Sequence, residues 1–224
     1  MSNARRTKSL IIACGVVVAI ALVAAVVVST QRDRRDTREI RNQSTIIMLE
    51  LTGDMDRAAM AMHAFNADGG LDLSGLEEQA ALDRRIDLAG KAQTAAAKVF
   101  ENGESAPDRL ATKLAGKSPD RIDAARQQLP QKMNWANGRQ IFQTHARAYA
   151  AAKAHLEFLK QHLGHWRIDP VGLRVNWDAQ QLQSEAEKLQ AQVTAAAAEQ
   201  GNLAAGAKPT TTMTTMTTSA TTRP

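Results

Sequence analysis

The residues best suited to metal or cofactor chemistry are histidines and methionines, and most of them lie in two stretches of the chain. Four of the five histidines share one segment: His145, His155, His162 and His165. The fifth, His63, follows Met60 and Met62 in an M-x-M-H string. Imidazole and thioether groups are common ligands of copper and of haem iron. These two stretches are therefore the places to look for a metal or cofactor site.

His145 lies between Phe142 and Tyr149, at a position where a helical bundle normally places an apolar side chain. One interpretation is a core histidine that is hydrogen-bonded to a facing polar residue. The other is a ligand that pairs with Met55 or Met62 to bind haem or copper inside the bundle. The sequence has no CxxCH motif, so any haem would be bound non-covalently. Both interpretations stay open on the sequence alone.

His162 and His165 are the histidines with the i, i+3 spacing that places two metal ligands on one helix face. His155 and His162 are two helical turns apart, about 10 Å along the axis, so they need a second helix to share one ion. Met60 with His63 forms a second possible site, because soft thioether ligands suit Cu(I). Methionines at helical spacing more commonly fill a core, however.

The sequence lacks the motifs of several large enzyme classes. The single cysteine, Cys14, lies in an apolar run, which leaves no CxxC site and no intramolecular disulfide. The patterns GxGxxG, GxxxxGK[ST], HExxH and GxSxG are all absent. We therefore predict that the chain is not an enzyme.

The elements that would position these side chains are helices. Aromatic residues make up only 4% of the chain against 44% hydrophobic residues, which favours close-packed helices and an all-α fold. The clearest periodicity repeats every seven residues, at Trp135, Phe142, Tyr149, Leu156 and Leu163. An earlier seam alternates spacings of three and four, at Met48, Leu51, Met55, Ala58, Met62 and Phe65. Such repeats are typical of helices that pack at a shallow angle.

The pattern predicts four helices, which cover residues 33–66, 74–102, 131–165 and 177–200. The glycine pair at 69–70 ends the first. Residues 104–129 are predicted to form a partly helical connection of two short pieces, one opened by Ser105 with Pro107 and the other by Ser118 with Pro119. Helices of comparable length bury their seams most simply as an antiparallel, up-down-up-down four-helix bundle, here over residues 30–203.

Trp166 and Trp177 bracket the loop before the fourth predicted helix. One interpretation is that both rings seal the end of the bundle. The other is that they form a contact patch for a partner or ligand, because tryptophan is enriched in binding hot spots.

Residues 10–28 form an uncharged apolar run, long enough to cover about 28 Å of hydrocarbon as a helix. We predict a basic tail at 1–9, an uncleaved transmembrane anchor at 10–29 and a disordered Thr- and Met-containing tail at 204–224. Basic residues lie on both sides of the run, and we expect a cytoplasmic N-terminus with the domain outside.

These predictions combine into a functional hypothesis. The net charge of +5 clusters on either side of the apolar run, which favours lipid headgroups over nucleic acid as the acidic partner. The expected protein is a non-catalytic helical bundle, tethered to the cell membrane, that acts as an extracytoplasmic protein-binding, sensor-like or scaffold module or self-associates. A haem- or copper-binding bundle that uses His145 is the alternative.

Overall fold

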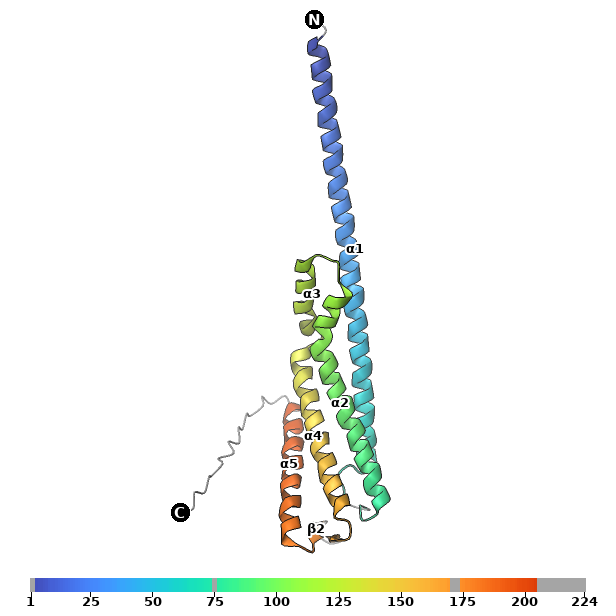
Figure 1. Ribbon diagram of the computed structural model, residues 1–224, viewed down its shortest axis with the longest axis vertical. Coiled ribbons are helices and arrows are strands. Elements are labelled where there is room, and N and C mark those ends of the chain that lie inside the picture. Colours follow the sequence, from blue (N-terminus) through green and yellow to red (C-terminus); the bar gives the residue numbers. More distant parts are fainter. Residues whose placement is uncertain (1–2, 74–75, 170–173, 205–224) are drawn as a thin grey trace, which may run out of the picture. The chain divides into compact units, whose positions relative to one another are not determined.

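The computed structural model describes residues 3–73, 76–169 and 174–204, with side chains from Ser29 onward except Arg174 and Ala204. Its helices are α1 (Asn3–Ala67), α2 (Gln79–Lys113), α3 (Pro119–Lys132), α4 (Trp135–Gln161) and α5 (Gln180–Ala204) (Figure 1). Strands β1 (Trp166–Asp169) and β2 (Arg174–Trp177) form one antiparallel pair. The predicted all-α class is confirmed.

The chain divides into two compact units. Unit 1 comprises residues 1–52 and 104–135, and unit 2 comprises residues 53–103 and 136–224. Both α1 and α2 contribute a segment to each unit. In unit 2 the chain runs along the end of α1, back along α2, forward along α4 and back along α5 (Figure 1).

The core of unit 2 is built from small and aliphatic side chains with a few aromatic rings. Phe65 of α1 and Tyr149 of α4 meet edge to face at 5.5 Å between ring centroids. Around them lie fully buried residues of α2 and α4, namely Leu82, Ala89, Ala92, Leu156 and Leu159. The heptad positions Tyr149 and Leu156 therefore face inward, as their spacing predicts.

Unit 1 has its own core between α1, α2 and α3. Ile47, Leu110, Leu114 and Leu129 are its largest members, and each is at most 1% exposed. At its edge Lys117 lies 2.9 Å from Asp36, and this ion pair lowers the pKa of the Asp36 carboxyl.

The end of α1 follows the prediction. Gly69 and Gly70 take φ values of 95° and 55°, which residues with a side chain rarely adopt. The Gly70 amide donates to the Phe65 carbonyl at 2.9 Å and so closes the last helical turn. The glycine pair thus ends the helix at Ala67.

Helix α2 begins at Gln79, whereas residues 74–75 of its predicted start lie outside the described residues. It also runs eleven residues past its predicted end at 102 and includes Pro107. An internal proline costs roughly 3 kcal/mol, but burying a leucine returns about 1.5–3 kcal/mol. The extension buries Leu110 completely, and Leu114, the residue directly after it, is also fully buried. This burial offsets the cost of the proline.

The third predicted helix, 131–165, is split by the structure. Helix α3 ends at Lys132, and α4 starts at Trp135 after Asn134, whose φ is 49°. Asparagine tolerates this left-handed conformation better than most residues. At its other end, α4 stops at Gln161, before the predicted end at 165, because Gly164, at φ 93°, reverses the chain. The Ser118-Pro119 start of α3 agrees with the prediction.

The predicted loop 167–176 belongs to a hairpin instead. Trp166 pairs with Trp177, and Ile168 with Val175, while residues 170–173 lie outside the described residues. Alternating β-branched and aromatic residues on both sides of the turn favour this pairing.

Two predictions concern segments beyond the described side chains. The tail after Ala204 is one of them, and the apolar run at 10–28 is the other. Among the residues whose side chains are described, no helix has the length and apolarity that crossing a membrane requires.

Candidate functional site

His145 is a half-buried residue of α4 with a polar partner on α5. Its Nδ1 atom lies 2.8 Å from the side-chain amide nitrogen of Gln200. Its ring lies between those of Phe142 and Tyr149, at centroid distances of 6.3 and 6.4 Å. Burial lowers the pKa of the imidazole, which keeps it neutral at pH 7. This geometry agrees with a core histidine that is hydrogen-bonded to a facing polar residue.

The two methionines proposed to pair with His145 face different environments. Met62 packs against the core of unit 2, whereas Met55 is 37% exposed. The predicted seam is wrong at Met55, because the neighbouring Asp54 takes the inward position and is only 5% exposed. The haem or copper site at His145 stays a prediction.

The other predicted metal ligands do not gather around a common point. The His162 ring packs at a tilt against that of Phe158, with 4.4 Å between the ring centroids, and its Nδ1 lies 3.0 Å from the Phe158 carbonyl oxygen. His165 is exposed and lies 4.0 Å from a carboxylate oxygen of Asp178. Met60 and His63 are both exposed on α1. Over the described part of the chain, no three histidine, cysteine or acidic side chains form a possible metal site.

The tryptophan pair closes one end of unit 2. Trp166 is 3% exposed, and its indole N–H donates to the Leu159 carbonyl at 2.8 Å. Trp177 is half-buried, 5.3 Å from Phe158 and 6.4 Å from Trp166 between ring centroids. The partner-contact interpretation is therefore wrong for Trp166, which is covered by the fold, while Trp177 keeps an exposed part.

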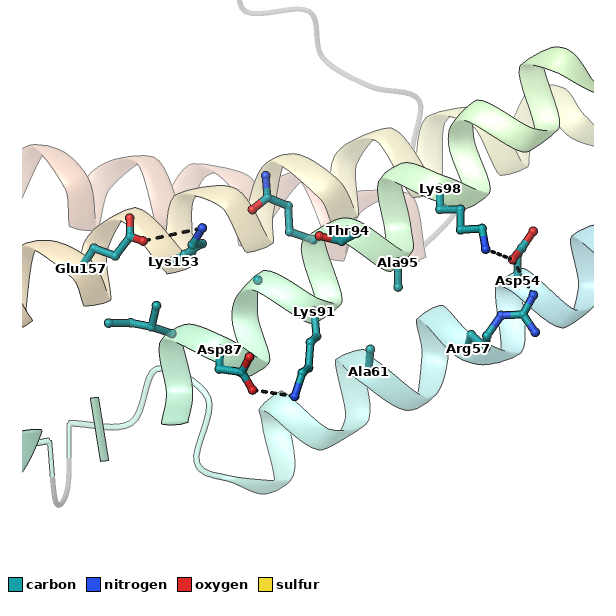
Figure 2. Close-up of a pocket in the computed structure, with 13 residues that line it drawn as sticks. Asp54, Arg57, Ala61, Asp87, Lys91, Thr94, Ala95, Lys98, Lys153 and Glu157 are labelled. Carbon is teal, nitrogen blue, oxygen red and sulfur yellow. Dashed lines mark hydrogen bonds and ion pairs between the residues drawn. The ribbon is translucent and has the colours of Figure 1, made fainter. Parts of the chain in front are cut away.

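A groove of about 930 Å³ lies between α1, α2 and α4 in unit 2 (Figure 2). Its charged side chains form ion pairs with one another. Lys91 lies 2.6 Å from Asp87, and Lys153 lies 3.6 Å from Glu157. Because these pairs neutralise each other locally, the groove offers no concentrated charge to an ionic ligand.

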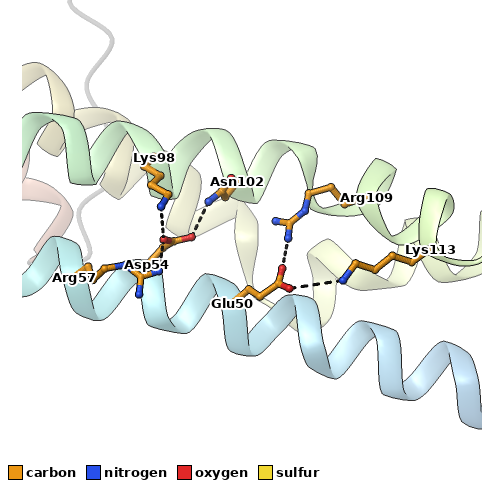
Figure 3. A network of polar contacts seen from close by, with 7 residues as sticks. All are labelled: Glu50, Asp54, Arg57, Lys98, Asn102, Arg109 and Lys113. Atoms are coloured by element: carbon orange, nitrogen blue, oxygen red, sulfur yellow. Dashed lines mark hydrogen bonds and ion pairs between the residues drawn. The ribbon is translucent and has the colours of Figure 1, made fainter.

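At one end of this groove, Asp54 is the centre of a polar cluster (Figure 3). Its Oδ1 atom lies 2.6 Å from Arg57 and 3.4 Å from Lys98, and its Oδ2 accepts from Asn102 at 2.6 Å. Burial alone would raise the pKa of Asp54, but these partners outweigh it and lower the pKa. The cluster joins α1 to α2 within unit 2.

A similar contact joins the same two helices within unit 1. Glu50 forms an ion pair with Arg109 and lies 3.6 Å from Lys113 (Figure 3). All three side chains are about one third or more exposed. This pair is therefore a surface feature and adds little to stability.

A second cavity, of about 690 Å³, lies in unit 2 between the segment before α2, helix α4, strand β2 and helix α5. His155 of α4 lines it and is 5% exposed. Its Nδ1 atom is buried without a hydrogen-bond partner among the described residues. Burial lowers the pKa of this imidazole as well. On other walls lie the Trp177 ring and Glu187, which accepts from Gln183 at 2.9 Å.

Sequence reasoning did not single out Asp54, and it weighed His155 only as a possible metal partner of His162. Asp54 has a readable signal, since it takes the inward place three residues after Leu51 and four before Ala58. His155 carries no such signal, because its surroundings come from segments distant in the sequence.

Comparison with protein-family models, curated proteins and solved structures found no match to this chain, so its function is argued from the geometry above.

Proposed function

We propose that this chain is a non-catalytic, membrane-tethered helical module that binds a protein partner or a second copy of itself. The observation that carries the proposal is the uncharged run at 10–28, which has the length and composition of a bilayer-spanning helix. The same helix α1 that begins at Asn3 continues to Ala67 and provides core residues to both units. A tether and the domain would thus share one continuous helix.

The surface of α1 in unit 1 supports the binding part of the proposal. Leu49 is 65% exposed and Ile46 is 41% exposed. Residues three apart lie next to each other on a helix, so these two side chains form one small apolar site opposite the buried Ile47. Large contiguous apolar patches mark protein contact surfaces, and we propose this pair as the centre of such a contact.

The tether and its direction are tested in cells. Reporters that are active on only one side of the membrane are fused after residue 30 and at residue 224 of the full chain. We expect membrane fractionation that resists alkaline extraction, with both reporters active outside the cytoplasm. Release of the protein by alkali contradicts the tether, and two cytoplasmic signals contradict the orientation.

The contact surface is tested with the membrane-bound full chain. Leu49→Lys places a charge in the apolar site, whereas Thr37→Lys adds the same charge at an exposed position of α1 about 120° around the helix. Chemical crosslinking in membranes should give a partner or dimer band that Leu49→Lys removes and Thr37→Lys keeps. Equal bands in both variants contradict binding through this surface.

A further inference from the structure

Three arginines of α1 in unit 1 share one exposed side of the helix: Arg34, Arg38 and Arg41. At 100° per residue they lie within about 60° of one another. None of them forms an ion pair with a residue whose side chain is described. They line an open hollow of about 350 Å³, together with Asp33 and Thr37. We call these three side chains the arginine face.

The acidic residues of the same segment are held by other cations. Asp36 lies 2.9 Å from Lys117, which also lies 3.7 Å from Glu39. Asp33 lies 2.7 Å from Arg121 of α3. Asp36 is also 8% exposed, on the side of α1 that lies about 140–160° from the arginine face. These acids therefore neutralise other cations of unit 1 and leave the arginine face positively charged.

The arginine face is suited to a phosphate ligand. Side chains three and four residues apart lie next to each other on a helix, so Arg38 is repelled by both Arg34 and Arg41. An anion bound between them would remove this repulsion. The planar guanidinium group also donates two parallel hydrogen bonds to a phosphate, which a simple point charge cannot do.

The position of the arginine face along α1 indicates where that phosphate comes from. Helix α1 continues without a break from the apolar run at 10–28. At 1.5 Å per residue, Arg34, Arg38 and Arg41 lie about 9, 15 and 20 Å beyond the end of this run. The headgroup layer is about 5–8 Å thick on each side of a bilayer, and its field extends about 10 Å further at 0.1 M salt. Arg34 therefore lies at the headgroups, Arg38 within their field and Arg41 at its outer limit.

We infer that the arginine face binds the phosphate groups of anionic phospholipids in the leaflet from which α1 emerges. The inference rests on the membrane tether of the proposed function, but neither on its direction nor on a protein partner. It gives the module a preference for negatively charged regions of the membrane, which the apolar run alone does not provide.

The test uses the full chain reconstituted in phosphatidylcholine vesicles. Traces of phosphatidylglycerol or phosphatidylcholine, each spin-labelled on an acyl chain, report through their EPR spectra how strongly each lipid associates with the protein. We expect the anionic lipid to be preferred. This preference should shrink when salt rises from about 0.1 to 1 M, because the Debye length falls from about 10 to 3 Å.

Two triple variants assign the preference to particular residues. The first neutralises the arginine face with Arg34→Gln, Arg38→Gln and Arg41→Gln. The matched control removes three exposed cations elsewhere with Lys132→Gln, Arg167→Gln and Lys188→Gln. The first variant should lower the preference for the anionic lipid about fivefold, which is the effect of about one arginine at full strength at the membrane surface. The control should keep the wild-type preference. Circular dichroism checks that both variants keep their helices.

Several outcomes would overturn the inference. One is an unchanged lipid preference in the first variant, and another is an equal loss in the control, which would make net charge the cause. A third is loss of the preference in inorganic phosphate at an ionic strength where chloride preserves it, which would make free phosphate the ligand. Release of the chain from the vesicles by alkali contradicts the tether and the inference together. A chain that stays bound without any lipid preference contradicts the inference alone.

Discussion

Replacing Asp54 by asparagine should destabilise unit 2 without changing its packing. The side chain keeps its size but loses its charge and one of its two acceptor oxygens. In the wild type, Oδ1 faces Arg57 and Lys98, and Oδ2 faces the Asn102 amide. Whichever way the new amide is oriented, its own donor group meets one of these donors. At least one contact of the cluster is therefore lost.

The expected size of the loss follows from the exposure of the partners. A hydrogen bond to a charged group contributes about 1.5–3 kcal/mol. Lys98 and Arg57 are 58% and 61% exposed, so each regains water and loses only the roughly 0.2–1 kcal/mol of a surface pair. The variant also no longer buries a negative charge, and the desolvation cost that it avoids offsets part of this loss of stability. We expect a net loss of about 1–3 kcal/mol in the free energy of unfolding.

Urea unfolding followed by circular dichroism measures this loss for the full chain in micelles. The control is Asp56→Asn, which removes the same charge at an exposed position of α1. The lowered pKa of Asp54 sets the pH dependence. The stability advantage of the wild type over Asp54→Asn should be full above pH 3.8, the ordinary pKa of the carboxyl. It should disappear as the pH falls through the lower pKa of the folded state.

If Asp54→Asn has the same free energy of unfolding as the wild type at pH 7, Asp54 does not stabilise unit 2 and the reasoning is refuted. It is equally refuted when Asp56→Asn is as destabilising as Asp54→Asn. A stability difference that persists unchanged far below pH 3.8 would show that the effect is not due to the carboxylate charge.

Two further predictions concern the cores. Leu129→Ala should destabilise unit 1 by about 2–5 kcal/mol, because Leu129 is 1% exposed, and hydrogen exchange should accelerate in α3 more than in α4. Equal acceleration in both helices would contradict separate opening of the units. His155 should make folding sensitive to acid, because its folded-state pKa is lowered. Below its ordinary pKa of 6.5 the unfolded chain binds more protons, so stability should fall between pH 6.5 and the lower folded-state value. Thermal melting of wild type and His155→Phe at pH 7 and 5 tests this, and an equal drop in both would exclude His155.

The helical class and the inward faces of the helices were predictable because both depend on local spacing. Tyr149 and Leu156 lie one heptad apart and are buried in the structure. The end of α1 was predictable for the same kind of reason, since the glycines at 69 and 70 act on the turn they occupy. These signals need no knowledge of distant contacts.

The split of the chain into two units was not predictable from such signals. It depends on α2 continuing through Pro107, which local propensity opposes and the burial of Leu110 and Leu114 allows. The break at Asn134 was also missed, because the predicted helix began at residue 131 although the heptad repeat begins only at Trp135. The continuation of α2 through Pro107 depends on tertiary packing, which no periodic pattern in the sequence indicates.

Two of the polar side chains buried in unit 2, Asp54 and His155, differ in how their burial is compensated. Asp54 meets three donors, so its burial is compensated and its role is to hold α1 against α2. The His155 ring nitrogen Nδ1 has no partner among the described residues and lies in a residue that lines an open cavity. A side chain needed only for packing would be better as leucine, which carries no desolvation cost. The burial of the His155 ring nitrogen is therefore uncompensated and costs stability, in contrast to the burial of Asp54.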